Sequence, residues 1–504
     1  MANPLYDSLF AIHADRHNNF IVDPTTGSSM SFAAFVTRTA QFATVIQAAG
    51  LMPGDRLVAQ IGKSVSALAL YAGCVQSGVI YLPLNAAYTV NEVEYFLSDS
   101  GASLLVCEVD AHAGLEPICN KFKAQSLTLS SDGLSGSLID RVDAADGTFQ
   151  TIDRTLDDLA ALLYTSGTTG RSKGAMLTQN NLLSNAQALT QLWQFNENDV
   201  LLHALPVFHT HGLFVATNVC LLAGAQMIFE PAFNTDRIIE LLPHATSMMG
   251  VPTFYTRLLL DERFNKTLTQ HMRLFVSGSA PLLAETHKQF EERTGHRILE
   301  RYGMTETNMT TSNPYNGDRR AGTVGFPLPD VEVKITDTDT GAQVPAGEIG
   351  QLEVRGPNVF EGYWKMPEKT AEEFREDGFF ITGDLAQIDA DGYVSIVGRD
   401  KDLIISGGYN IYPKEIELVL DDQPGVNESA VVGVPHPDFG ETVVGILVAE
   451  PDAINLAHIE AAVAESLARF KHPRKLLVVE SLPRNSMGKV QKNVLREKYS
   501  DLFS

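Results

Sequence analysis

The chain has 504 residues, of which 44% are hydrophobic and 20% are charged, and its formal net charge is −23. A hydrophobic core stops growing at roughly 250 to 300 residues, so the length excludes a single small domain, and the ordinary composition excludes a disordered or fibrous protein. The 61 acidic residues outnumber the 38 basic ones and repel the phosphates of nucleic acids and anionic membranes, so we expect neither as a partner.

The N-terminal part of the chain alternates between segments of helical periodicity and short runs rich in β-branched residues. This pattern is typical of βαβ units and predicts a largely parallel sheet. The predicted helices cover residues 31–49, 66–77 and 90–98, and the predicted strands cover residues 56–61, 79–84 and 103–109.

The same alternation resumes later, with predicted strands at 160–164, 226–230, 246–250 and 273–276 and an amphipathic helix at 282–293. After Gly322, short strands separated by Gly and Asp turns indicate an antiparallel β subdomain. Beyond Gly398, strands and helices mix again.

We therefore predict an α/β multidomain fold, with a large N-terminal domain of parallel-rich, αβαβα-type sheets and a small, mobile α+β C-terminal domain. The predicted N-terminal domain covers residues 1–398 and includes the β subdomain at about 322–398. Residues 399–402 form a hinge, and residues 403–504 form the C-terminal domain.

Cysteine usage and the N-terminus indicate a cytoplasmic location. The four cysteines show neither a CxxC pair nor the spacing of zinc ligands, which favours a reducing compartment. The first residues lack the basic region and apolar core of a signal peptide. The longest apolar stretch, at 65–75, is shorter than the ~20 residues that span a bilayer.

The segment from Tyr164 to Gly174, YTSGTTGRSKG, directly follows a predicted apolar strand. Its small residues let the backbone wrap around phosphates, its hydroxyls donate hydrogen bonds, and Lys173 supplies a cation. It is not a Walker A loop, because Gly170 and Lys173 are separated by two residues. By itself, an ordinary surface loop would explain the segment equally well.

Six further motifs follow in order: LPVFHTHG (205–212), SGSAP (277–281), ERYGMTE (300–306), ITGD (381–384), GRDKDLIISGG (398–408) and PRNSMGK (483–489). These six motifs and the segment at 164–174 make the chain resemble the adenylate-forming superfamily, which includes acyl-CoA synthetases, luciferases and peptide-synthetase adenylation domains. The resemblance extends over nearly the whole chain, and it is strongest to malonyl-CoA and methylmalonyl-CoA synthetases of the acyl-CoA synthetase branch.

The resemblance implies that ATP and Mg²⁺ bind to these motifs. The hydroxyls of residues 165–169 and Lys173 hold the β- and γ-phosphates, Thr305 contacts the α-phosphate, and Glu306 binds Mg²⁺, a hard cation that prefers carboxylate oxygen. Tyr302 stacks on adenine opposite the 278–281 backbone, while Asp384 and Arg399 hold the ribose. The full set implied for ATP or AMP is Thr165, Ser166, Gly167, Thr168, Thr169, Gly170, Lys173, Gly278, Ser279, Ala280, Pro281, Arg301, Tyr302, Gly303, Met304, Thr305, Asp384, Arg399 and Lys489.

The same resemblance implies three catalytic residues, Lys489, Thr305 and His209. Lys489 reaches the α-phosphate and the acid's carboxylate during adenylation, and it is also a target for a lysine acetyltransferase and deacetylase. Lys401 is the hinge about which the small domain rotates, so that Ser406, Gly407 and Gly408 then line the coenzyme A channel. The acid pocket is expected to contain Arg237, His209, Thr210, His211, Ser277 and Met304.

Each residue also has a purely structural interpretation. Tyr302 and Asp384 suit a core or a turn, Glu306 suits a helix terminus, His209 suits a satisfied buried histidine, and both lysines suit a solvated surface. The ordered set of motifs favours the functional interpretation, in which His209 gates the pocket and is not a general base.

The predicted activity is ATP-dependent ligation of an acid to coenzyme A through an acyl-adenylate, with release of AMP and pyrophosphate. Alternatives are an adenylation enzyme that loads a carrier protein in trans, a luciferase-like oxygenase and a non-catalytic adenylate sensor. A buried arginine needs an anion, so Arg237 favours the second carboxylate of a short diacid, malonate or methylmalonate. A structural partner such as Asp236 or Glu230 is the competing interpretation for Arg237, and a small monocarboxylic or aryl acid is the competing substrate.

Overall fold

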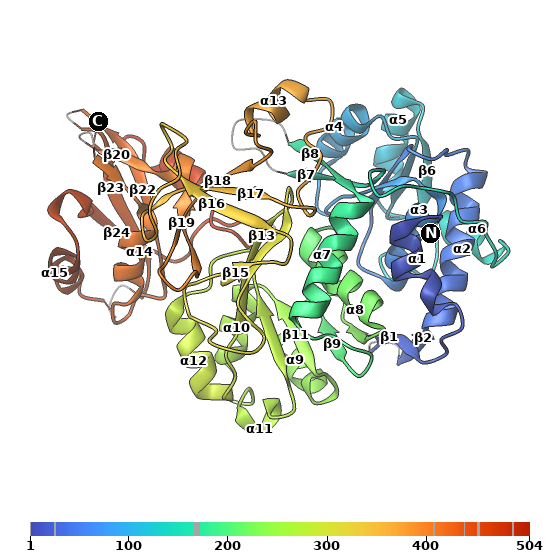
Figure 1. Cartoon of the computed structure of the whole chain (residues 1–504), viewed down its shortest axis with the longest axis horizontal. Coiled ribbons are helices and arrows are strands. Elements are labelled where there is room, and N and C mark those ends of the chain that lie inside the picture. The colour runs from blue at the N-terminus through green and yellow to red at the C-terminus, as the bar shows by residue number, and fades with distance from the viewer. Residues whose placement is uncertain are drawn as a thin grey trace.

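The structure, a computed structural model, describes residues 2–24, 27–165, 172–406, 409–437, 439–450, 454–485 and 488–503. These residues form four sheets, and the two ends of the chain lie at opposite ends of the molecule's long axis (Figure 1). Two large sheets carry the N-terminal three fifths of the chain, and two smaller ones follow.

The six-stranded sheet contains the predicted βαβ units. Its strands are parallel except β8, and central strands such as β4 are buried on both faces, as a parallel sheet covered by helices requires. The strand order is β6 (Gln125–Thr128), β5 (Leu104–Cys107), β3 (Arg56–Gln60), β4 (Ile80–Pro83), β7 (Leu159–Thr165) and β8 (Lys173–Thr178). The helices that connect these strands or precede them are α2 (Phe32–Ala48), α3 (Val65–Ser77), α4 (Val90–Ser100), α5 (His112–Phe122) and α6 (Ser137–Asp143).

Local sequence signals set the ends of these helices. The Ser64 side chain caps α3, and Gly78 ends it with a φ of 71°, a left-handed conformation that favours glycine. Thr89 and Glu92 form a reciprocal capping box at the start of α4. The helices and strands predicted between residues 31 and 109 are confirmed, and their observed ends differ from the predicted ends by two residues or fewer.

The nine-stranded sheet has a parallel centre and antiparallel edges. Its order is β15 (Phe326–Pro327), β14 (Asn308–Ser312), β13 (Leu299–Met304), β12 (Leu274–Ser277), β11 (Ser247–Gly250), β9 (Val200–His203), β10 (Gln226–Phe229), β1 (Asn19–Asp23) and β2 (Ser28–Ser31). The associated helices are α1 (Pro4–Leu9), η1 (Ala11–His13), α7 (Gln179–Leu192), the π-helix η2 (His211–Thr217), α8 (Asn218–Ala223), α9 (Thr235–Leu241), η3 (Leu242–His244), α10 (Pro252–Leu259), α11 (Lys266–Thr269) and α12 (Ala284–Thr294).

The sheet that follows Gly322 is antiparallel throughout, as its Gly and Asp turns predict. It consists of β16 (Glu332–Thr336), β17 (Gly350–Arg355), β18 (Phe380–Ile388) and β19 (Val394–Arg399), with α13 (Pro367–Glu372) between β17 and β18.

The C-terminal part is a mixed sheet with helices, and it lies beside the four-stranded sheet at the far end from the N-terminus (Figure 1). Its elements are η4 (Asp400–Asp402), β20 (Ile404–Ser406), β21 (Tyr409–Ile411), α14 (Pro413–Asp421), β22 (Glu428–His436), β23 (Gly440–Val448), α15 (Leu456–Ser466), η6 (Arg469–Lys471), β24 (Lys475–Val479) and α16 (Lys492–Lys498). The predicted multidomain α/β fold is confirmed, whereas the exact domain boundaries stay a prediction.

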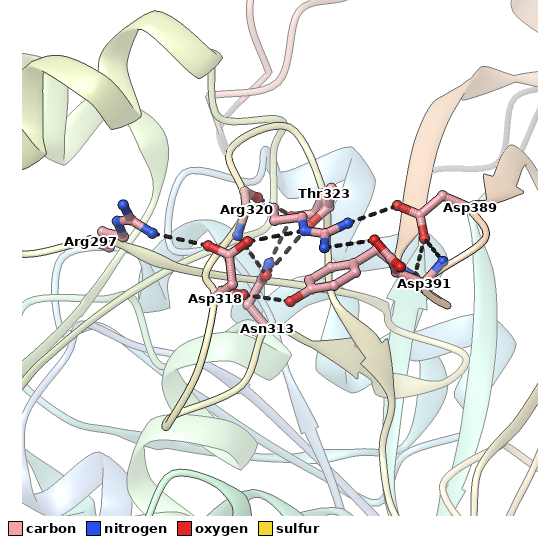
Figure 2. A network of polar contacts seen from close by, with 8 residues as sticks. Arg297, Asn313, Asp318, Arg320, Thr323, Asp389 and Asp391 are labelled. Carbon is pink, nitrogen blue, oxygen red and sulfur yellow. Dashed lines mark hydrogen bonds and ion pairs between the residues drawn. The ribbon is translucent and has the colours of Figure 1, made fainter.

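A polar network joins the nine-stranded sheet to the four-stranded one (Figure 2). Arg320, in the connection from β14 to β15, donates hydrogen bonds to Asp318, to Asp389 and to Asp391, and the last two lie in the turn between β18 and β19. The phenol of Tyr393 donates to the Asp318 carbonyl at 2.7 Å. The turn that ends β18 is thereby held against the edge of the large sheet.

No helix in the described part of the chain is both long and apolar enough to cross a membrane.

Candidate active site

Three of the residues expected to bind the nucleoside meet where β13, β18 and β19 adjoin. Asp384 and Arg399 face each other across the β18–β19 ladder, and the Arg399 Nε lies 2.6 Å from the Asp384 carboxylate. The Tyr302 hydroxyl donates a hydrogen bond to the same carboxylate. Burial, followed by the charge of Asp384, raises the pKa of Tyr302 well above its usual range. Asp384 is therefore held in one orientation by two partners.

The β13–β14 hairpin presents Thr305 and Glu306 at its tip. A Cβ on Gly303 would lie only 1.8 Å from the Asn308 carbonyl oxygen, so the close approach of the two strands requires glycine there. Asn308 adopts a φ of 48°, in the left-handed region that asparagine tolerates. Glu306 is 5% exposed, and burial raises the pKa of its carboxyl. Thr305 remains partly exposed beside it.

Lys173 lies at the first position of β8, opposite Thr165 at the end of β7. Its Nζ is 3.1 Å from Glu373 and 3.9 Å from the centroid of the Tyr363 ring. The predicted phosphate-binding residues between these strands, Ser166, Gly167, Thr168, Thr169 and Gly170, lie outside the described residues, as do Gly407 and Gly408 of the predicted thiol channel.

A second group of polar side chains surrounds Arg301, the β13 residue next to Tyr302. Arg301 is 3% exposed, and its Nε and Nη2 have no hydrogen-bond partner among the described residues. Burial lowers the pKa of the guanidinium to about 9. A Cβ on Gly278 would lie 2.3 Å from the Arg301 Cζ, so glycine at 278 is what leaves space for the guanidinium.

Further atoms near Arg301 are buried without a partner in the described structure. They are Nδ1 of His209 and Nε2 of His211, two rings on which the charge of Arg301 acts, and the opposite nitrogen of His211 lies 3.3 Å from the Ser279 hydroxyl. The buried Oγ of Ser277, another predicted pocket residue, also lacks a described partner, but Ser277 pairs with Glu300 in the β12–β13 ladder and so points to the other face from Arg301. Burial, and then the charges of Lys489 and Arg301, lower the pKa of His209 to about 3. The imidazole of His209 is therefore neutral near pH 7. The unpaired cation and polar atoms together form a cradle that suits an anion.

His211 is the first residue of the π-helix η2, and buried contacts from Lys63 through His203 reach the first turn of this helix. The Lys63 Nζ donates to the His203 carbonyl at 2.7 Å and lies 3.0 Å from the His203 Nδ1. Since an ammonium only donates, Nδ1 accepts and the ring proton is on Nε2, which contacts the Gly212 carbonyl at 2.9 Å. π-Helical turns are frequent at functional sites. Thr210, just before this helix, donates to the Asn308 side chain.

Arg237 does not belong to this cradle. It lies on α9 with one third of its side chain exposed, and it forms ion pairs with Glu230 at 3.1 Å and Glu240 at 2.6 Å. Within the described residues it also donates to the Pro24 carbonyl at 3.3 Å. The geometry supports the structural alternative, pairing with Glu230, because a guanidinium already matched by two carboxylates has no unbalanced charge for a substrate.

The C-terminal part contributes Lys489. This residue remains accessible to solvent, yet its pKa is lowered, first by the protein atoms that crowd it and then by the charge of Arg399. Asp384, Arg301 and Glu306 also act on its charge, so the turn at 488–489 lies beside both groups of residues.

A residue of the C-terminal part also contacts the backbone at the expected hinge. Arg496 on α16 donates to the Lys401 carbonyl at 3.1 Å and also pairs with Asp402. Ser406, expected in the thiol channel, ends β20 and is the residue through which β20 pairs with β23.

Sequence reasoning placed Arg301 in the nucleotide set and did not foresee its burial near His209 and His211. One signal was available. Arg301 lies in β13, whose first three residues are buried, and arginine is seldom fully buried unless it has a partner. The contacts of Tyr363 with Glu306, of Glu373 with Lys173 and of Lys63 with His203 had no signal, since the residues of each pair are 57 to 200 positions apart.

Comparisons with known proteins show which family the chain matches. The family model for "AMP-binding enzyme" matches residues 10–364, and that for "AMP-binding enzyme C-terminal domain" matches residues 415–489. Malonate–CoA ligase of Arabidopsis thaliana is 37% identical over 481 residues, covering 89% of this chain and 78% of that protein.

Among solved structures, ATP-bound MatB of Rhodopseudomonas palustris is 55% identical over all of both chains, with a TM-score of 0.98. Apo MatB of the same species is also 55% identical over all of both chains, with a TM-score of 0.88. The fold described here is therefore closer to the ATP-bound arrangement than to the apo one.

Proposed function

Because this chain belongs to the family of AMP-binding enzymes, we propose that it is an AMP-forming acid–thiol ligase that joins malonate to coenzyme A. ATP, Mg²⁺ and coenzyme A are the further reactants, and methylmalonate is the nearest alternative acid. The similarity to a malonate–CoA ligase and to MatB over most or all of the chain supports the acid.

The observation that carries this substrate is the buried, unpaired guanidinium of Arg301. A monocarboxylate would use its one charge at the phosphate and leave Arg301 without a counter-ion. A short diacid has a second carboxylate for it, and His211 and Ser279, which are 3.3 Å apart, offer further donors and acceptors near Arg301. The charges of Arg301 and Glu306 both act on Lys489, so the lysine proposed for adenylation is in the electrostatic environment of both sites.

The residues present also fit the nucleotide and its metal. Mg²⁺ is usually held by one or two carboxylates together with substrate phosphates, and Glu306 offers a buried carboxylate whose one described side-chain donor is Tyr363. When bound, the metal neutralises phosphate charge. Asp384, fixed by Tyr302 and Arg399, presents acceptors suited to ribose hydroxyls.

In the first half-reaction, a carboxylate oxygen of malonate bonds to the α-phosphorus of ATP, and the bond to pyrophosphate breaks. Lys489 and Thr305 supply a cation and a hydroxyl where negative charge develops, which lowers the barrier between two anions. Neutral His209 bounds the pocket without adding charge. In the second half-reaction, the coenzyme A thiol, losing its proton, attacks the acyl carbon and AMP leaves.

Two arginine variants test the substrate assignment. We expect Arg301→Met to lower malonate kcat/KM by roughly thirtyfold to several thousandfold, since an unpaired buried charge costs about 2 to 5 kcal/mol. Activation of butyrate, which lacks the second carboxylate, should change far less, so the butyrate-to-malonate ratio rises. Arg237→Gln is the matched control and should preserve that ratio. Pyrophosphate release measured across a set of acids provides the readout.

Retention of malonate activity within about twofold in folded Arg301→Met would remove Arg301 as the ligand of the distal carboxylate. A parent protein that activates aryl or monocarboxylic acids more efficiently than malonate would overturn the substrate itself. Failure of any acid to release pyrophosphate would overturn the ligase.

Two finer proposals accompany this function. Lys489 combines solvent access with a lowered pKa, which favours the nucleophilic amine, so a lysine acetyltransferase would remove the charge needed for adenylation and a deacetylase would restore it. Mass spectrometry of protein from its native cells tests this, and absence of the modification under all growth conditions contradicts it. A cytoplasmic location, expected from the sequence, is tested by cell fractionation.

A further inference from the structure

Tyr363 connects two residues that the proposed function uses separately, the metal carboxylate Glu306 and the phosphate-binding Lys173. Its hydroxyl lies 3.0 Å from a Glu306 oxygen and 2.8 Å from a Glu373 oxygen. The other oxygen of Glu373 lies 3.1 Å from the Lys173 Nζ, which is also 3.9 Å from the centre of the Tyr363 ring. One buried side chain, 3% exposed, therefore contacts both sites.

The backbone around Tyr363 is attached to the same two places. Trp364 donates to the Gly174 carbonyl at 2.7 Å, and Tyr363 forms a β-bridge with Ala175, so the segment pairs with the strand that begins at Lys173. Three residues before Tyr363, the Phe360 amide donates to the Glu306 carbonyl at 2.8 Å. The ring is thus held between Lys173 and Glu306 by main-chain contacts on both sides.

Glu306 and Glu373 depend on the Tyr363 hydroxyl to different extents. A phenol has one proton to donate, and two carboxylates lie within reach of it. Glu373 is already balanced by Lys173 and by Lys369 at 3.2 Å. Burial alone would raise the pKa of Glu373, but its contacts with Tyr363, Lys173 and Lys369 outweigh burial and lower that pKa. Among the described side chains, Glu306 has Tyr363 as its one hydrogen-bond donor. Loss of the Tyr363 hydroxyl would therefore leave Glu306, but not Glu373, without a described side-chain partner.

We propose that Tyr363 is a positioning residue that holds the metal carboxylate and the phosphate-binding lysine at a fixed separation. Its hydroxyl orients Glu306, and its ring, together with Glu373, seats the Lys173 ammonium. This rests on the roles proposed above for Glu306 and Lys173. Partners that orient a metal-binding carboxylate are typically worth 10- to 100-fold in metal affinity, and a cation over an aromatic ring adds a smaller contribution.

Two substitutions separate the hydroxyl from the ring. In Tyr363→Phe the ring and the Lys173–Glu373 pair remain, so we expect Mn²⁺ affinity in the presence of ATP to fall 10- to 100-fold, while metal-free ATP binding changes less than threefold. In Tyr363→Leu the ring is also lost, and metal-free ATP binding should weaken at least threefold. Titration calorimetry with ATP in EDTA and Mn²⁺ titration followed by electron paramagnetic resonance provide both readouts.

Tyr393→Phe is the matched control, because it removes a phenol hydrogen bond of 2.7 Å in the network of Figure 2, away from these residues. It should leave both affinities unchanged, and neither Phe variant should change the KM for malonate. Equal Mn²⁺ affinities in Tyr363→Phe and the parent would overturn the inference while leaving the ligase intact. A parent that binds ATP without any metal dependence would overturn both.

Discussion

Two arginines show how environment decides the role of a residue. Arg237 lies on an exposed helix and meets two glutamates, whereas Arg301 lies in a strand interior and meets no carboxylate within the described residues. A buried cation without a partner is costly, so it persists where function supplies an anion. The sequence indicated Arg237 from its residue type and position, whereas the packing around each guanidinium favours Arg301 for the role proposed above.

Lys489 gives the sharpest prediction at this scale. Removing a cation aimed at the reacting phosphorus should cost on the order of 3 to 4 kcal/mol, so Lys489→Ala should lower the adenylation rate by at least a hundredfold. Thioester formation from supplied malonyl-adenylate should be nearly unaffected, because the lysine acts before that step. Pyrophosphate exchange and single-turnover thioester assays measure the two halves, and equal losses in both would contradict this division.

At the scale of elements, α14 shows how burial of one carboxylate limits stability. Asp421, the last residue of α14, has a buried Oδ1 that no described residue contacts by a hydrogen bond. Burial raises its pKa from 3.8 to about 6, opposed by a hydrogen bond from Ser429. A carboxyl whose folded pKa is raised stabilises the fold fully below pH 3.8, and this contribution is lost as pH rises through about 6.

Asp421→Asn removes the ionised form and should therefore stabilise the C-terminal part above pH 6. A shift of this size corresponds to about 2 to 3 kcal/mol at most. We expect calorimetry to give a higher Tm for the variant at pH 8 and nearly equal Tm values for variant and parent at pH 4. A difference that is independent of pH would show that Asp421 is not the titrating group.

At the scale of the whole molecule, we propose that the segment around Lys401 is a hinge between two working arrangements. Lys401 lies in the short 3₁₀-helix η4, and Arg496 holds its carbonyl while Lys489 lies beside the nucleotide residues. This is the arrangement that suits adenylation. Thiol attack requires Lys489 to leave, so the backbone at the hinge has to change its φ and ψ angles.

Lys401→Pro should permit the present arrangement and hinder the change, because proline fixes φ near the helical value and is tolerated in the first turn of a helix. Adenylate should then form at nearly the parental rate while thioester formation slows at least tenfold. Single-turnover assays of each half-reaction test this, with Lys401→Ala as the control for loss of the side chain. Normal rates in both steps would place the hinge elsewhere.

The sequence by itself determined the fold class, the family and many of the elements, and it predicted the nucleotide residues. Helix caps such as Ser64 and Gly78 act locally, and the seven motifs keep their order and spacing along the chain. Tertiary structure alone decided the strand order, the entry of β1 and β2 at the edge of the large sheet, and the π-helix at 211–217. It also decided which arginine lacks a counter-ion and that Tyr363 contacts both Glu306 and the Lys173 side chain. The physical reason is distance along the chain: caps and periodicity depend on neighbours a few residues away, whereas charge pairing and desolvation depend on side chains that only folding brings together.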